Sequence, residues 1–224
     1  MNNIIAPATP TLTEAQEAPA TPLLRRGGGR FGIFGGSFNP IHNGHIALAR
    51  QLRQLAGLDE VWFMVSPQNP MKRQTDLLDD RLRFEMTRRV LEHEEGLVAC
   101  DYELHLPKPS YTWNTLQHLS KDYPGHTFIL LIGGDNWQLF PRWYHADDIV
   151  SNYRIVVYPR RGSDIDQSQL PENVTVVETE LLDISSTEIR RRVMMHHPVS
   201  DMVPPAIERL VMEYYGRPTA TKET

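Results

Sequence analysis

The chain has 224 residues, of which 40% are hydrophobic and 23% charged, and its 28 Asp and Glu outnumber 23 Lys and Arg for a formal net charge of -5. This length and apolar content suit one globular domain and exclude a wholly disordered or fibrous chain. The negative balance argues against a protein that coats DNA or RNA, so we expect no nucleic-acid partner. The single cysteine, Cys100, excludes an internal disulfide. No apolar run approaches the roughly 18 residues of a membrane span, so we expect a cytoplasmic protein without a membrane partner.

Residues 1–29 differ in composition from the rest of the chain. Ala, Pro and Thr make up 13 of the first 24 residues, and no basic residue precedes Arg25. Such a composition cannot bury a core and predicts a disordered N-terminal extension. The extension lacks the basic start and apolar run of a secretory signal. Residues 217–224 are expected to form a short polar tail, which leaves residues 30–216 as the domain.

Between the tails, short apolar runs alternate with segments of helical periodicity. The pattern predicts strands over 30–34, 60–65, 97–100, 127–132, 154–158 and 174–177, and helices over 44–56, 78–90, 112–119, 186–195 and 204–214. Strands that alternate with helices indicate an α/β fold with a doubly wound, mostly parallel sheet. In such sheets, ligands bind beyond the carboxyl ends of the strands, so we look for the site in the segments just after the first, second, fourth and last predicted strands.

The first strand leads into the segment Gly35-Gly36-Ser37-Phe38-Asn39-Pro40-Ile41-His42-Asn43-Gly44-His45. Two glycines allow the backbone to approach a ligand closely. His42 and His45 lie three residues apart at a predicted helix start, where free N–H groups and the helix dipole favour an anion. Two imidazoles there suit a phosphate that gains negative charge during reaction. On these residues alone, two hydrogen-bonded caps are the simpler interpretation, and a metal pair would lack a nearby carboxylate or cysteine.

The same string resembles the signature of the nucleotidylyltransferase superfamily, which shares its fold with class I aminoacyl-tRNA synthetases. In its longer form it looks like the bacterial nicotinate-nucleotide adenylyltransferase family. Four later segments agree with that family in order and spacing: Ser66-Pro67-Gln68-Asn69-Pro70-Met71-Lys72, Pro109-Ser110-Tyr111-Thr112, Gly133-Gly134-Asp135 with Trp143-Tyr144, and Ile184-Ser185-Ser186-Thr187-Glu188-Ile189-Arg190. The resemblance covers about residues 30–215. It implies a Rossmann-like nucleotidylyltransferase fold. It also implies adenylyl transfer from ATP to nicotinate mononucleotide, which yields nicotinate adenine dinucleotide and pyrophosphate in NAD biosynthesis.

The last of these segments also has a physical interpretation of its own. Ser185 and Glu188 have the Ser-x-x-Glu spacing of a capping box. Ser186, Thr187 and Arg190 add hydroxyls and a cation within the first two turns, which makes a second anion site. By resemblance, this segment holds the ATP phosphates opposite the histidines. We therefore expect two cationic pockets to grip one triphosphate from opposite sides.

The resemblance assigns further residues to each substrate. The catalytic residues it implies are His42, His45, Arg190 and Lys72. Those implied for ATP are Gly35, Gly36, Ser37, Phe38, His42, His45, Gly133, Asp135, Ser185, Ser186, Thr187 and Arg190. Those implied for nicotinate mononucleotide are Ser37, Lys72, Thr112, Trp143 and Tyr144. For Asp135, contact with ribose, contact with magnesium and a helix N-cap stay open.

The resemblance implies Mg2+ as a cofactor that bridges the phosphates, and we assign it no side-chain ligands. Asn39 stands where the family more usually has aspartate, which puts any magnesium or histidine-orienting role at this position in doubt. Nicotinamide mononucleotide and phosphopantetheine are the rival acceptors. A non-catalytic nucleotide- or RNA-binding module is the rival of a different class. The sequence permits a homo-oligomer.

Overall fold

The computed structural model describes residues 28–67, 77–160, 162–163, 165–180 and 182–216. Lys72, residues 1–27 of the predicted extension and the predicted tail 217–224 lie outside the described residues. The extension and tail therefore stay predictions. No helix in the described part of the chain is long and apolar enough to cross a membrane.

Six strands form one sheet in the order β3-β2-β1-β4-β5-β6, and every neighbouring pair is parallel. The strands are β1 (Arg30–Gly36), β2 (Glu60–Val65), β3 (Leu97–Cys100), β4 (Thr127–Gly133), β5 (Arg154–Tyr158) and β6 (Val174–Val176). The predicted α/β, doubly wound fold is confirmed. The strands are nearly continuous apolar runs because a parallel sheet is buried on both faces.

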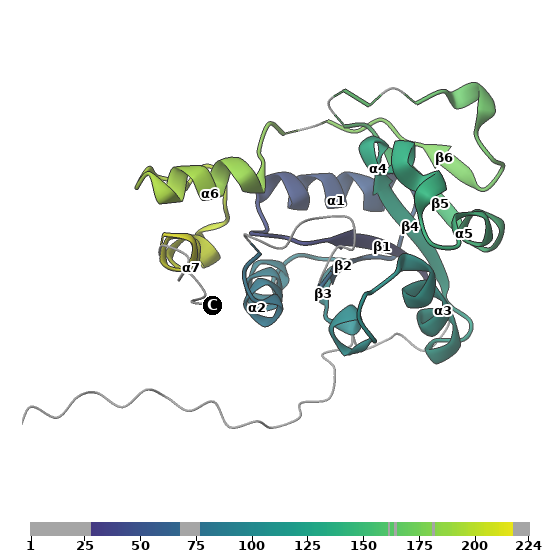
Figure 1. Ribbon diagram of the computed structural model, residues 1–224, viewed down its shortest axis with the longest axis horizontal. Coiled ribbons are helices and arrows are strands. Elements are labelled where there is room, and N and C mark those ends of the chain that lie inside the picture. The colour runs from purple at the N-terminus through teal and green to yellow at the C-terminus, as the bar shows by residue number, and fades with distance from the viewer. Residues whose placement is uncertain (1–27, 68–76, 161, 164, 181, 217–224) are drawn as a thin grey trace, which may run out of the picture.

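Helices cover both faces of the sheet (Figure 1). They are α1 (Asn43–Leu55), α2 (Asp80–Leu91), α3 (Thr112–Asp122), α4 (Gly134–Leu139), α5 (Ala146–Asn152), α6 (Ser186–Met194) and α7 (Pro205–Tyr215), with 3-10 turns η1 (Tyr102–His105), η2 (Phe140–Arg142) and η3 (Gln167–Gln169). Two apolar cores follow from the alternation of side chains along each strand. Phe34 and Phe63 join the core under α1, α2, α6 and α7. Ile33 and Trp62 join the core under α3 and α5.

Two short helices, α4 and α5, were not predicted. The sequence predicts that Gly133-Gly134 ends a strand, whereas the chain passes from β4 into α4 without a loop, with Gly133 as the N-cap. Asp135 is therefore the second residue of the helix, and its interpretation as an N-cap is wrong. A Cβ on Gly134 would lie 2.4 Å from Ser163 Oγ, so the tight passage requires glycine there.

The order of the strands locates the site. Strands follow one another outward from β1 to β3 on one side and from β4 to β6 on the other. The direction of winding therefore reverses between β1 and β4. A crevice forms beyond the carboxyl ends of strands at such a point, which here means Gly36 and Gly133.

Candidate active site

Open space lies beside Gly35, near the carboxyl end of β1. A Cβ on Gly35 would meet no atom within 4 Å, whereas one on Gly36 would lie 2.9 Å from the Phe38 ring. Phe38 is only 2% exposed and packs its ring 5.3 Å from that of Phe63. Its assignment to ATP is thus limited to its backbone, because its side chain belongs to the core. Ser37 accepts a hydrogen bond from buried Arg83 through its carbonyl oxygen.

His42 and His45 come together at the start of α1, as predicted. Their rings stack with centroids 3.6 Å apart. His42 is the N-cap, and its backbone N–H donates to Nδ1 of His45 over 3.3 Å. The His42 ring faces the first amides of α1 as in a capping box. Its buried Nδ1 makes no hydrogen bond of ordinary geometry to any described residue.

Burial keeps both imidazoles neutral at pH 7. Desolvation, with the positive charge of Arg160 as a second cause, lowers the pKa of His42 from 6.5 to about 4. The pKa of His45 is also well below its usual value, first through burial and then through His42 and Arg160. Positive charge on the histidine side therefore comes from Arg160 and not from the imidazoles themselves. Because Nδ1 of His45 accepts a hydrogen bond, its single ring proton sits on Nε2 and is available to a ligand.

Arg160 is the site residue that sequence reasoning missed. It follows β5 by two residues, and its guanidinium lies 5.7 Å from the Tyr158 ring centroid. Its Nε lies 3.9 Å from an Asp135 carboxylate oxygen. Its charge also depresses the pKa values of both histidines. Arg160 thus brings a permanent cation beside the histidines from the far side of the β1–β4 switch.

The N-terminus of α6 packs onto the histidine loop. Ser186 Oγ donates to the carbonyl of Pro40 over 2.9 Å, and Arg190 Nη1 donates to the carbonyl of Asn39 over 2.7 Å. Arg190 Nη2 also approaches Thr187 Oγ1 at 3.5 Å. The structure therefore joins the two predicted anion sites through the β1–α1 loop.

The predicted capping box at Ser185 is half formed. Ser185 Oγ accepts from the Glu188 backbone N–H over 3.2 Å. The Glu188 carboxylate instead pairs with Arg191 and Arg192, which lower its pKa to about 2. The helix is thus capped by Ser185, the residue before its first turn, while the Glu188 side chain pairs with the two arginines.

Asn39 serves as a hydrogen-bond acceptor for neighbouring elements. Its Oδ1 accepts from the Tyr215 hydroxyl over 2.7 Å and from the Leu78 backbone N–H over 3.3 Å. Its side chain is 5% exposed. The amide oxygen thus holds the histidine loop against the C-terminal helix α7 without requiring the aspartate charge.

Two of the segments expected to contact the mononucleotide meet at the start of α3. Thr112 is the first residue of that helix. The ring of Tyr144, 49% exposed, lies 4.7 Å from that of Tyr111. Trp143 is half-buried and packs 5.3 Å from the Phe140 ring. The structure therefore brings the two predicted segments together, with Tyr144 open to solvent and Trp143 against the core.

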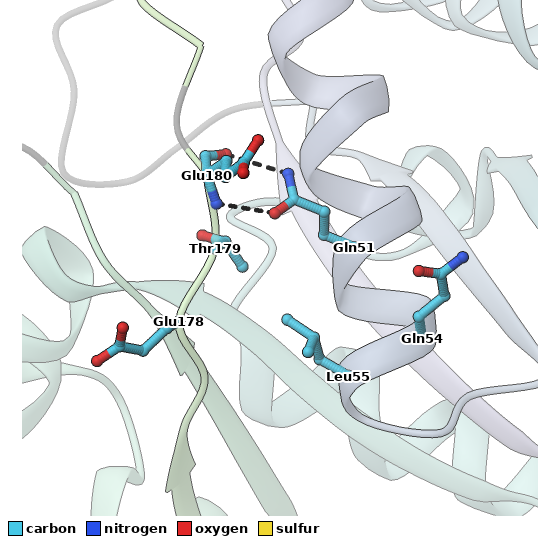
Figure 2. A pocket seen from close by; sticks show the side chains of 6 residues that line it. All are labelled: Gln51, Gln54, Leu55, Glu178, Thr179 and Glu180. Carbon is cyan, nitrogen blue, oxygen red and sulfur yellow. Dashed lines mark hydrogen bonds between the residues drawn. The ribbon is translucent and has the colours of Figure 1, made fainter.

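The described residues contain no group of three or more His, Cys, Asp or Glu side chains that could hold a metal ion. A polar hollow of about 510 Å³ lies elsewhere, between the C-terminal half of α1 and the segment after β6. Figure 2 shows Gln51 holding that segment through two hydrogen bonds with the backbone of Glu180, of 3.1 and 2.8 Å. The hollow lies at the opposite end of α1 from His45.

Comparisons with known proteins agree with this geometry. The model of the cytidylyltransferase-like family matches residues 33–192. A protein of Bacteroides fragilis named "Probable nicotinate-nucleotide adenylyltransferase" is 47% identical over 81% of this chain and 90% of its own length. One of the same name from Bacteroides thetaiotaomicron is 44% identical over 82% and 91%.

Solved structures show the same fold. Plasmodium falciparum nicotinic acid mononucleotide adenylyltransferase complexed with NaAD superposes with a TM-score of 0.68 at 21% identity, over 83% of this chain and 94% of that one. Its complex with APC gives a TM-score of 0.66 at 20% identity, over the same shares of the two chains. On the family match and the identity to its relatives, the chain belongs to the cytidylyltransferase-like family and, within it, to the nicotinate-nucleotide adenylyltransferases.

Proposed function

We propose that the protein transfers the adenylyl group of ATP to nicotinate mononucleotide, forming nicotinate adenine dinucleotide and pyrophosphate in NAD biosynthesis. The observation that carries the proposal is the convergence of three features at the β1–β4 switch. These are the stacked pair His42 and His45, the N-terminus of α6 with Arg190, and the cation Arg160. Neutral donors and guanidinium groups around one open glycine suit a polyphosphate.

The reaction requires no covalent bond between the protein and a substrate. An oxygen of the mononucleotide phosphate attacks the α-phosphorus of ATP, the new P–O bond forms, and the bond to pyrophosphate breaks. The attacking oxygen is already anionic, so no strong base is required. Catalysis then rests on alignment of the two substrates and on stabilisation of charge at the phosphoryl oxygens.

The chain supplies these two needs with different groups. We assign the Nε2–H of His45 and the ring of His42 to the α- and β-phosphate oxygens. Arg190 and Lys72 support the leaving pyrophosphate, and Lys72 stays a prediction because it lies outside the described residues. We add Arg160 as a further cation, since its charge already acts on both imidazoles.

The remaining ATP assignments concern the two glycine turns and the start of α6. Gly35, Gly36, Ser37, Gly133 and Asp135 border the switch, and Ser185, Ser186 and Thr187 form the first turn of α6 or precede it. Mg2+ commonly keeps its waters and binds through one or two carboxylates together with substrate phosphates. The exposed carboxylate of Asp135 fits that role, so we propose that magnesium arrives with ATP.

The acceptor side rests on Thr112, Trp143 and Tyr144. Their place around the start of α3 favours an aromatic base over the flexible chain of phosphopantetheine, because an exposed ring offers a stacking surface. Preference for nicotinate over nicotinamide, a homo-oligomeric state, a cytoplasmic location and the lack of a nucleic-acid partner stay predictions from the sequence.

Release of pyrophosphate from ATP tests the proposal, with nicotinate mononucleotide, nicotinamide mononucleotide and phosphopantetheine as parallel acceptors. We expect turnover with nicotinate mononucleotide to exceed that with the other two. Absence of turnover with all three, combined with tight and salt-sensitive RNA binding, would instead support the non-catalytic module.

A further inference from the structure

A buried carboxylate lies behind the acceptor side of the site. Glu103, in η1, is 6% exposed. Its Oε2 accepts from Ser66 Oγ over 2.8 Å and from Ser110 Oγ over 3.3 Å. Its Oε1 accepts from Thr115 Oγ1 over 2.9 Å. Three hydroxyls, one after β2 and two at the start of α3, thus converge on one side chain.

These segments all border the site. Ser66 follows the carboxyl end of β2, and its N–H donates to the carbonyl of Gly36. Ser110 and Thr115 flank the start of α3, which carries Tyr111 and Thr112. Thr115 Oγ1 also lies 3.3 Å from the carbonyl of Tyr111, which places Tyr111 within the same network.

Ser66 connects this network to the loop expected to hold ATP. Its carbonyl accepts from the buried guanidinium of Arg83 over 3.0 Å, and the same Nη1 donates to the carbonyl of Ser37. Arg83 Nε also donates to the carbonyl of Leu78 over 2.8 Å. Arg83 and Glu103 therefore share Ser66 as a common neighbour, one through its carbonyl and the other through its hydroxyl.

Stability alone does not explain such an arrangement. Taking a carboxylate out of water is costly, and apolar side chains of similar volume commonly stabilise a core as well or better. Burial accordingly raises the pKa of Glu103, against the opposing effect of the three hydroxyls. What a carboxylate adds is direction, because each hydroxyl must point at one of its two oxygens.

We propose that Glu103 is a positioning residue for the acceptor mononucleotide, a role that rests on the function proposed above. It ties the segment Ser110–Thr112 to Ser66, and through Ser66 and Arg83 to the loop that carries ATP. The tie sets the distance between the acceptor phosphate and the α-phosphorus, and small displacements at this distance have large effects on rate.

The test uses the full chain and three variants. Glu103→Gln keeps the shape of the side chain but places an N–H donor among hydroxyl donors. Thr115→Val removes one of the three hydroxyls at nearly constant volume. Tyr102→Phe is the matched control, because it removes a buried hydroxyl that bonds Asp122 at the other end of α3. Pyrophosphate release gives kcat and the KM of each substrate, and thermal unfolding gives stability.

We expect kcat to fall about tenfold in Glu103→Gln and about threefold in Thr115→Val. KM for nicotinate mononucleotide should rise by similar factors, with KM for ATP within about twofold of the wild type. Tyr102→Phe should lower the unfolding temperature without that split. Equal rises in both KM values, or no rise in either, would overturn the proposal. Should Glu103→Gln fail to fold, Thr115→Val decides the question.

Failure of the proposed function is distinguishable from failure of this inference. An inactive wild type refutes the proposed function, and KM for the acceptor can then no longer be measured. Amide hydrogen exchange over residues 110–116 then tests the tie itself. Faster exchange in Glu103→Gln and Thr115→Val than in Tyr102→Phe supports it, whereas equal exchange in all three overturns it.

Discussion

Replacement of His45 separates its two hydrogen-bonding roles. Its Nδ1 accepts from the backbone N–H of His42, which leaves Nε2–H as the ring donor. His45→Asn places an amide oxygen near the position of Nδ1, so it can keep the bond to His42, but it supplies no donor at the position of Nε2. His45→Gln can keep both bonds, because a Gln oxygen at this third helical position can accept from the His42 N–H as in a capping box while its amide N–H lies near Nε2.

The expected fall in kcat follows from the loss of one preorganised hydrogen-bond donor at the reacting phosphate. Such a loss typically lowers kcat by about 10²- to 10³-fold, or about 2.7–4 kcal/mol. We expect this drop in His45→Asn, with KM for ATP little changed and thermal stability retained. His45→Gln should keep more of kcat and also retain thermal stability, because its side chain can still accept from the His42 N–H.

The assay is steady-state pyrophosphate release with ATP and nicotinate mononucleotide, alongside thermal unfolding of each variant. The decisive quantity is the ratio of kcat between the two variants. If His45→Asn turns over as fast as His45→Gln, the donor at Nε2 has no part in the chemistry, and His45 is a helix cap alone.

Three further predictions concern the same site. Acidification from pH 7 should destabilise the protein, because the unfolded chain protonates His42 near 6.5 and the folded chain only near 4. The contribution of about 3 kcal/mol is complete above pH 6.5 and is lost as the pH falls toward 4, so the urea midpoint should fall less in His42→Asn. Arg160→Ala should raise the pKa of both histidines in an NMR titration and raise KM for ATP about tenfold, with Arg160→Lys intermediate; unchanged imidazole titration would refute the electrostatic contact. Gly35→Ala should leave thermal unfolding unchanged, since its Cβ meets nothing within 4 Å, yet weaken ATP binding in calorimetry if the nucleotide occupies that space.

The elements that could be predicted are those whose burial produces a clear pattern of hydrophobic residues in the sequence. Strands of a parallel sheet are apolar on both faces, so runs such as Thr127–Gly133 stand out against amphipathic helices. All six strands and five of the seven helices in the described part of the chain were predicted, within a few residues at each end. Helices α4 and α5 were missed because they have six and seven residues, too few to show helical periodicity.

Site residues were predictable where a motif or a strand end marks them. Arg160 carries no motif, but it follows the end of β5, and applying the strand-end rule to that strand as well would have found it. Glu103 carries no such signal. Its role depends on hydroxyls 37, 7 and 12 residues away in the chain, and only the folded structure shows that they meet.

The protonation state of the histidines is the point at which structure changes the chemistry. A sequence shows two imidazoles beside an anion site and thereby favours cations. Stacking at 3.6 Å makes a second positive charge costly, and burial disfavours even the first. The positive charge must then come from groups that cannot lose it, which are the guanidinium groups of Arg160 and Arg190. A site organised in this way keeps its donors and its charge separate, so neither changes with pH across the neutral range.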